Sequence, residues 1–191
     1  MRVRPSVWLT AIVLLAAGGV ALLTRGMGFT ARAEPGSVEE RLALAARRWA
    51  TPRDVRSQTS PVPPTSEAVR GAMEHWADHC AGCHGNDGSG RTSIGKSFYP
   101  PVPDMRADRT QRMTDGELFY VIERGVPFTG MPAWGNGTAD GERQSWELVL
   151  FIRYLPSLGE NEIADMEKLN PRSAAQIEEE RRVNDFLAGG R

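Results

Sequence analysis

The sequence predicts an all-α protein, in which one compact helical region lies between an apolar segment and a helical extension. Apolar residues recur at helical spacing in several segments, whereas no segment shows the two-residue alternation of a half-buried strand. Three of the expected helices also begin with the pattern of a capping box. We therefore divide the chain into an anchor or signal segment, an amphipathic helix with a linker, a folded domain and an extension: 1–33, 34–64, 65–159 and 160–191.

The first part contains an uncharged apolar run, 7–23, which follows Arg2 and Arg4. The run is at the lower limit of length for crossing the apolar core of a bilayer, and it is long for the apolar part of a signal peptide. Ala31-Arg32-Ala33 has the A-x-A form of a cleavage site. An uncleaved anchor, a cleaved signal peptide and a buried core helix stay open, and the first two place the rest of the chain across a membrane.

The second part begins with a predicted amphipathic helix over 38–50, preceded by a capping-box pattern at Ser37 and Glu40. Its apolar residues recur at helical spacing: Val38, Leu42, Ala45, Ala46 and Trp49. The helix either packs on the folded domain or lies on a lipid surface, with Trp49 at the interface and three arginines near the headgroups: Arg41, Arg47 and Arg48. Thr51–Pro64 contains four prolines, which predicts an extended linker.

The folded domain is expected to contain helices over 66–81, 115–124 and 141–155, with Gly- and Pro-rich segments between them. Thr114 and Glu117 form a capping-box pattern at the start of the second helix. The extension after residue 159 predicts one or two more helices, with a break at Asn170-Pro171 and a third capping box at Ser173. Its apolar residues are sparse, so we expect it to pack only in part.

The chemistry is concentrated in Cys80-Ala81-Gly82-Cys83-His84, which contains the only two cysteines of the chain. The C-x-x-C-H pattern is typical of c-type haem attachment, because two thiols at this spacing can each bond one vinyl group while the histidine ligates the iron. Three other interpretations have weaker support: a thioredoxin-like dithiol, a zinc site and a buried structural pair of cysteines. A thioredoxin-like dithiol requires a βαβ context, which is absent, and a zinc site would have to recruit His75 and His79.

A sixth iron ligand is sought among the downstream methionines: Met105, Met113 and Met131. Met131 is the expected ligand, because it lies in a segment over 125–135 whose glycines and prolines prevent a helix and favour a loop. A loop can carry a flexible thioether over the second face of the haem.

These motifs resemble those of class I monohaem cytochromes c, and more narrowly the membrane-anchored bacterial type attached to respiratory oxidases and periplasmic dehydrogenases. The matching segments are 80–84, the turn 85–88, the stretch 99–105 and the loop 130–134. The resemblance covers 65–159. It implies a class I cytochrome c fold in which the helices over 66–81 and 141–155 cross. The predicted N-terminal transmembrane helix or signal segment and the helical C-terminal extension lie outside the part that it covers.

The resemblance implies one covalent haem c on Cys80 and Cys83, with His84 and Met131 as axial ligands of the iron. A carbonyl within Pro100–Pro103 is then expected to accept the Nδ1–H of His84. Four residues are candidate donors to the propionates: Arg91, Lys96, Tyr99 and Trp134.

The function implied is electron transfer rather than enzymatic catalysis, because both axial positions are filled. The expected location is the bacterial inner membrane, with residues 7–23 in the bilayer and the haem domain in the periplasm; cleavage after Ala33 would give a secreted periplasmic protein. Expected partners are an oxidase, a dehydrogenase or a quinol-oxidising complex. The near-zero net charge argues against nucleic acid. A cytochrome subunit of an oxidoreductase complex and a haem-based gas sensor stay as alternatives.

Overall fold

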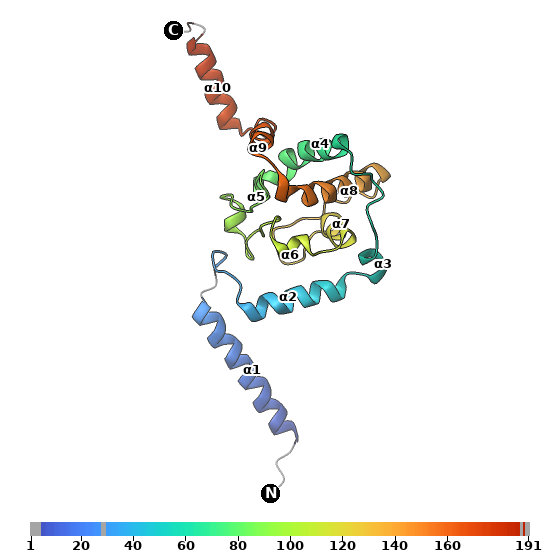
Figure 1. Cartoon of the computed structure of the whole chain (residues 1–191). Helices are drawn as coiled ribbons and strands as arrows, with labels where there is room; N and C mark the ends of the chain where they lie inside the picture. The colour runs from blue at the N-terminus through green and yellow to red at the C-terminus, as the bar shows by residue number, and fades with distance from the viewer. Residues whose placement is uncertain (1–4, 28–29, 188, 190–191) are drawn as a thin grey trace.

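The computed structural model describes residues 5–27, 30–187 and 189 of the chain (Figure 1). No strand occurs in this described part, and the predicted all-α class is confirmed. In chain order the helices are α1 (Pro5–Met27), α2 (Ser37–Ala50), α3 (Arg53–Arg56), α4 (Ser66–His75), η1 (Trp76–Cys80), α5 (Ala81–His84), η2 (Gly95–Ser97), α6 (Asp108–Gln111), α7 (Asp115–Arg124), α8 (Ala139–Tyr154), η3 (Leu155–Ser157), α9 (Glu160–Glu167) and α10 (Ala174–Leu187).

The core forms where α4 and α8 pack against each other and α7 packs on α8. The ring of Phe119 from α7 stacks on that of Trp146 from α8, with centroids 4.2 Å apart and planes at 8°. Phe151 and Val149 are fully buried in the same cluster. Burial of these side chains supplies the main stabilisation of a domain this small.

Side-chain caps fix where two of these helices begin. Thr114 and Glu117 form the predicted reciprocal capping box, and α7 matches the expected range 115–124. The third core helix begins two residues before the expected 141, because the hydroxyl of Thr138 accepts the Gly141 amide at 3.0 Å and caps the helix from residue 138.

The helix expected over 66–81 is longer and is interrupted. A π-helical turn, η1, separates α4 from α5, and the helix continues to His84. The predicted single helix was wrong because the spacing of apolar residues does not reveal a π-helical turn, which contains one more residue than an α-helical turn. Such turns are frequent at functional sites.

The capping box predicted at Ser37 is not formed. Gly36 is the N-cap and Ser37 is already helical, because Glu40 pairs with Arg109 of α6 instead of turning back. The neighbouring carboxylate of Glu39 accepts the Tyr99 hydroxyl at 2.6 Å. Helix α2 therefore lies against the domain along the side formed by α6.

The linker is less extended than predicted, because it contains the short helix α3. The α3 backbone lies directly on α7: a Cβ placed on Gly116 would be 1.8 Å from the Val55 carbonyl oxygen. Only glycine permits this approach, so the contact depends on Gly116.

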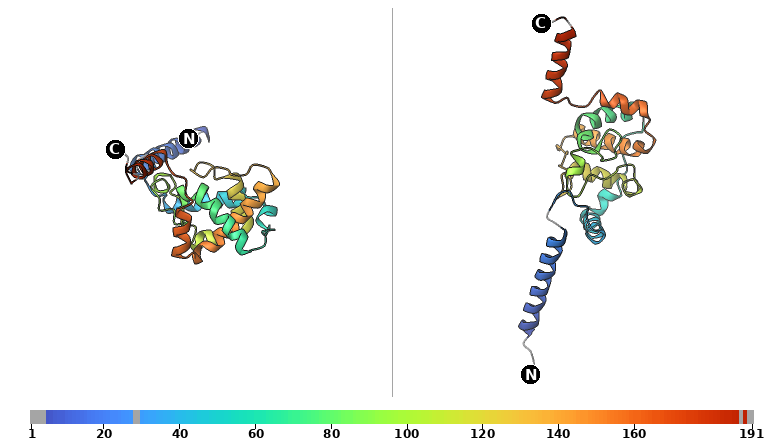
Figure 2. Two further views of the ribbon diagram at one scale, coloured as in Figure 1. Left: turned by 90° about the horizontal axis from the view of Figure 1, so that it is seen from above. Right: turned by 90° about the vertical axis from the view of Figure 1, so that its left-hand side faces the viewer.

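The two ends of the chain project in opposite directions, α1 from one side of the domain and α10 from the other (Figure 2). The predicted break at Asn170-Pro171 separates α9 from α10, and Ser173 and Gln176 form the predicted reciprocal cap. Arg2 and Arg4 lie outside the described residues. Within the described residues, no helix combines the length and apolarity needed to cross a bilayer, so the expected span stays a prediction.

Candidate haem-binding site

The C-x-x-C-H motif occupies the last helical turns before Gly85, where the backbone turns away with φ +77°. The carbonyl groups of Cys83 and His84 at this helix end both accept hydrogen bonds. The Gly90 amide donates to the His84 oxygen at 2.7 Å, and the Thr92 hydroxyl donates to the Cys83 oxygen at 3.0 Å. These bonds hold both cysteines and the histidine on one rigid turn.

Trp76 orients this turn, although the sequence analysis did not single it out. Its buried indole lies 5.4 Å from the His84 ring and 5.3 Å from the Phe151 ring, and its Nε1–H donates to the Gly85 carbonyl at 2.9 Å. The available signal was its position eight residues before His84, which places both on one face of a helix.

His84 is a neutral imidazole at physiological pH. Burial lowers its pKa from 6.5 to about 4, so its nitrogen lone pairs are available for a metal. Its Nδ1 is buried and has no hydrogen-bond partner in the described structure, so the expected bond to a carbonyl of Pro100–Pro103 is not formed. The Val102 carbonyl instead packs closely on Gly90: a Cβ placed on Gly90 would lie 2.4 Å from that oxygen.

The two cysteines are unbridged thiols. Burial, with a smaller contribution from Cys83, raises the pKa of Cys80 to about 12. A redox dithiol needs a lowered thiol pKa, so this environment disfavours that alternative. His75 and His79 lie ring to ring at 4.9 Å, and no group of three metal-ligating side chains occurs among the described residues.

Met131 lies in a closed, non-helical loop, as predicted. Its carbonyl accepts the Val126 amide at 3.1 Å, and its amide donates to the Thr129 hydroxyl at 3.1 Å. The loop then returns to α7, since the Trp134 amide donates to the Ile122 carbonyl at 3.0 Å. The backbone around Met131 is therefore well defined by its own hydrogen bonds.

The structure brings this loop to the C-x-x-C-H helix. Trp134, three residues after Met131, meets His79, the residue before Cys80, with ring centroids 5.7 Å apart at 87°. This contact joins segments more than fifty residues apart in the sequence. The side chains of the other candidates are engaged elsewhere: Met113 sulfur accepts from Arg47 at 3.5 Å, and Met105 packs on the core.

Comparison with known families identifies this region. Residues 67–152 match the family described as Cytochrome C oxidase, cbb3-type, subunit III. Residues 67–152 form a class I monohaem cytochrome c domain. No curated protein sequence matches the chain.

A cytochrome c domain binds its haem covalently and carries electrons. The residues present fit such a group. A buried neutral imidazole and two unbridged cysteines lie on one rigid turn of this domain, and their spacing is that of the attachment motif.

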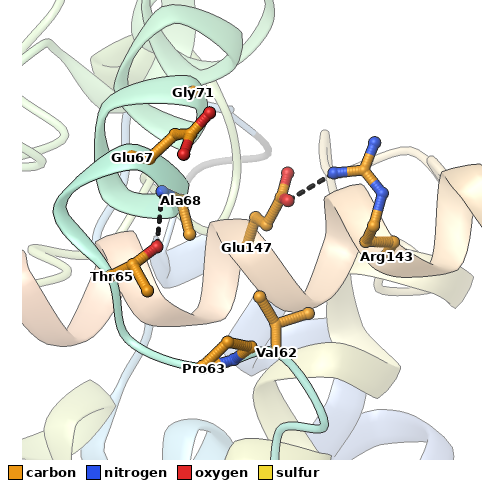
Figure 3. A pocket seen from close by; sticks show the side chains of 8 residues that line it. All are labelled: Val62, Pro63, Thr65, Glu67, Ala68, Gly71, Arg143 and Glu147. Atoms are coloured by element: carbon orange, nitrogen blue, oxygen red, sulfur yellow. Dashed lines mark hydrogen bonds and ion pairs between the residues drawn. The ribbon is translucent and has the colours of Figure 1, made fainter.

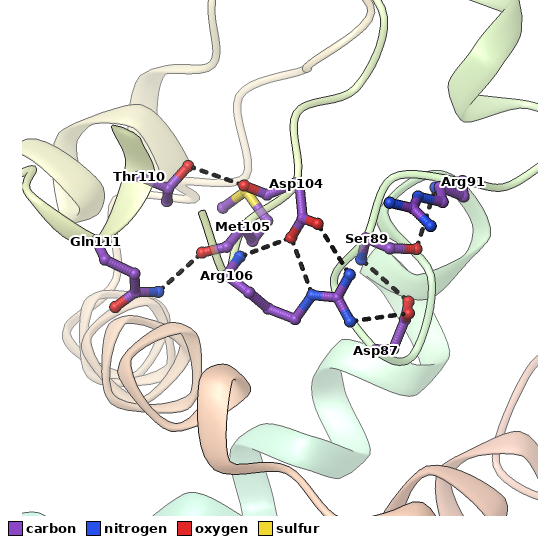
Figure 4. A network of polar contacts seen from close by, with 8 residues as sticks. All are labelled: Asp87, Ser89, Arg91, Asp104, Met105, Arg106, Thr110 and Gln111. Carbon is purple, nitrogen blue, oxygen red and sulfur yellow. Dashed lines mark hydrogen bonds and ion pairs between the residues drawn. The ribbon is translucent and has the colours of Figure 1, made fainter. Parts of the chain in front are cut away.

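A polar network braces the turn after the motif (Figure 4). Arg106 donates to both carboxylate oxygens of Asp104, at 2.9 and 2.8 Å, and lies 3.3 Å from Asp87. Hydrogen bonding to Arg106 lowers the pKa of Asp104. The guanidinium thereby ties the turn 85–90 to the stretch 99–106 of the cytochrome c domain.

Of the four candidate propionate donors, Tyr99 donates to Glu39 and Trp134 contacts His79, whereas Arg91 and Lys96 are exposed. Two surface grooves lie elsewhere on the domain. One lies between the linker at Val62 and the helices α4 and α8 (Figure 3), and the other lies between the same linker and α8. Arg143 and Glu147 of α8 form an ion pair beside them. These grooves are separate from the cysteine motif.

Proposed function

We propose that this protein transfers electrons through one haem c bound to Cys80 and Cys83, with His84 and Met131 as the axial ligands of the iron. The bound haem supplies reversible one-electron exchange between ferric and ferrous iron. The observation that carries the ligand assignment is the contact between Trp134 and His79, because it brings the Met131 loop beside the attachment helix.

Each residue has a distinct role in this proposal. His84, kept neutral by burial, offers a nitrogen to one side of the iron. Met131 offers an uncharged thioether, which favours ferrous over ferric iron and raises the reduction potential. Trp76 is a positioning residue, since it contacts the His84 ring and bonds the backbone of Gly85. If His84 and Met131 both hold the iron, no position on the metal would remain for a substrate, as an electron carrier requires.

Matched methionine variants test the ligand assignment. Met131→Leu keeps the volume of the side chain but removes its sulfur, and we expect attached haem, a lower reduction potential and loss of the weak long-wavelength iron–sulfur band. Met113→Leu is the control and should leave band and potential unchanged. An unchanged spectrum in Met131→Leu, or loss of the band in Met113→Leu, would overturn the assignment. Carbon monoxide binding to the reduced wild type would favour the gas-sensor alternative.

The proposed location is the periplasmic side of the bacterial inner membrane. Its support is the uncharged run 7–23, which lies within the 23-residue helix α1 and exposes its apolar side chains. Attachment of c-type haem on the outer side of that membrane, as the resemblance implies, is consistent with it. Alkaline extraction of membranes separates an anchored chain from a secreted one, and the intact mass shows whether cleavage follows Ala33.

A second candidate is a cytochrome subunit of a respiratory oxidase complex, favoured by the description of the matching family. Purification of the full chain from mild detergent tests it. An oxidase or dehydrogenase that co-elutes in fixed proportion supports the subunit, and a free monomer supports an independent carrier.

A further inference from the structure

Helix α2 has two opposite faces, and only one of them is used by the domain. Four residues at helical spacing form the face turned to the domain, each buried or half-buried: Glu40, Leu44, Arg47 and Thr51. The residues two positions earlier are rotated by about 200° around the helix. That outer face contains Val38, Leu42, Ala45 and Trp49, all exposed.

The outer face is unusually apolar for a surface helix. Val38 is 61% exposed, Leu42 66% and the indole of Trp49 89%. Single exposed apolar residues are ordinary, but a continuous stripe along one helix marks an interaction surface.

The charges of α2 are divided in the same way. Its two acidic side chains are bound to the domain, Glu39 by Tyr99 and Glu40 by Arg109. Arg47 also faces the domain, where burial and then the nearby Arg109 lower its pKa. Because Arg47 is turned inward, the expectation that it meets lipid headgroups is wrong.

The charges left outside this contact are cationic. Arg41 and Arg48 flank the apolar stripe and form no ion pair with any described residue. An apolar stripe with a tryptophan and flanking arginines is the pattern of a helix that lies in the interface of a membrane.

We infer that α2 docks on an anionic lipid surface, with the Val38–Trp49 stripe in the headgroup boundary and Arg41 and Arg48 on lipid phosphates. The arrangement of the chain supports lipid as the occupant. Helix α2 lies between the domain and the far end of α1, and α10 projects on the other side (Figures 1 and 2).

The consequence is a fixed height and tilt for the haem domain. A single anchoring helix followed by a linker would leave the domain free to turn, whereas a helix bound to both lipid and domain holds it. The domain side formed by α6 then faces the membrane, and α10 faces the aqueous phase. This inference rests on the membrane attachment proposed above, and the experiment below separates the two.

The test uses the full-length holoprotein in nanodiscs that contain phosphatidylglycerol. Both native cysteines are expected to be consumed by haem attachment, so an introduced cysteine provides a single thiol for a nitroxide label. Labels are placed at Leu42→Cys and Trp49→Cys. Lys168→Cys, directly after α9, is the aqueous control, and Leu14→Cys is the reporter of α1. Accessibility to oxygen and to a water-soluble nickel chelate is measured in the oxidised state, each relative to the same labelled sample under nitrogen, because reductants destroy the nitroxide.

We expect the ratio of oxygen to nickel accessibility to be several-fold higher at positions 42 and 49 than at position 168. Replacing Arg41 and Arg48 by glutamine should lower the lipid-exposed population by roughly fivefold per arginine in anionic discs. In neutral phosphatidylcholine discs the same replacement should have little effect. An unchanged haem spectrum shows that each variant is folded.

Three results would overturn the inference. The first is labels at positions 42 and 49 in water while the label at position 14 is in lipid. The second is a lipid-exposed population that does not depend on Arg41 and Arg48. The third is dipolar coupling between labels of two copies, which would show that α2 pairs with a second α2. A label at position 14 in water would instead refute the proposed anchor.

Discussion

Replacing Gly130 by alanine tests how firmly the loop around the proposed ligand Met131 is held. A Cβ at this position would lie 2.5, 2.6 and 2.8 Å from three carbons of the Phe98 ring. Ordinary contact begins at 3.4 Å, so the ring or the loop has to move by about 0.9 Å. Since Gly130 precedes Met131 directly, part of that movement reaches the sulfur.

The expected cost follows from overpacking. Added methyl groups in packed sites cost about 1–3 kcal/mol. Because Phe98 is half-buried and Gly130 is exposed, we expect a cost of about 1–2 kcal/mol here. In a domain of this size each kcal/mol lowers the melting temperature by about 4–8 °C. Thermal unfolding followed by haem absorbance measures the loss, and the long-wavelength band reports the weakened iron–sulfur bond at the same time.

A double-mutant cycle with Phe98 tests whether the ring is what the added methyl group meets. Phe98→Leu removes the ring that the new methyl group meets, so Gly130→Ala should cost at least about 1 kcal/mol less in the Phe98→Leu background than alone. If the two free energies add, or if Gly130→Ala leaves stability and spectrum unchanged, the loop does not rest on Phe98 as described.

The remaining predictions concern backbone strain at Phe128, the pH dependence of His84 and the half-buried guanidinium of Arg153. Phe128 has φ +61° and is fully exposed at 101%, so Phe128→Gly should stabilise the domain by about 0.5–1 kcal/mol in denaturant unfolding; destabilisation would contradict this. Burial lowers the pKa of His84 from 6.5 to about 4, so its contribution to stability is complete above pH 6.5 and is lost as the pH falls toward 4. Binding of the haem iron by His84 would also oppose protonation of the imidazole. The acid transition of the haem spectrum should therefore lie near or below pH 4, and a midpoint at pH 6.5 would refute this. Arg153 donates to Asp115 and to two backbone carbonyls, so Arg153→Met should cost about 2–3 kcal/mol in denaturant unfolding, whereas the exposed control Arg181→Met should change stability little.

Local signals explain which helices the sequence predicted well. Helix α7 was placed at its exact bounds because its cap, Thr114, and its end, Gly125, both act within a few residues. The break at Pro171 and the cap at Ser173 were found for the same reason.

Tertiary contacts explain the errors. The cap expected at Ser37 failed because Glu40 is bound by Arg109, sixty-nine residues away. Helix α3 was missed because its place is fixed by contact with Gly116 rather than by periodicity. Neither partner can be identified from spacing along the chain.

The residues of the candidate site also divide into those with a local signal and those that depend on tertiary contacts. The attachment motif is contiguous, so the sequence alone is enough to predict Cys80, Cys83 and His84 as haem-binding residues. The contact of Trp134 with His79 and the orienting role of Trp76 depend on the fold, and they were not predicted. Met131 stays a prediction that the neighbouring contact supports.

The most direct test of the central claim is the optical spectrum of the purified chain, oxidised and reduced, with a pyridine haemochrome assay. The protein is produced in cells competent in c-type maturation. We expect one covalent haem per chain, reversible one-electron reduction of its iron and a long-wavelength band in the oxidised form. A colourless protein from such cells, or a haem that acid-acetone extraction removes, would contradict it.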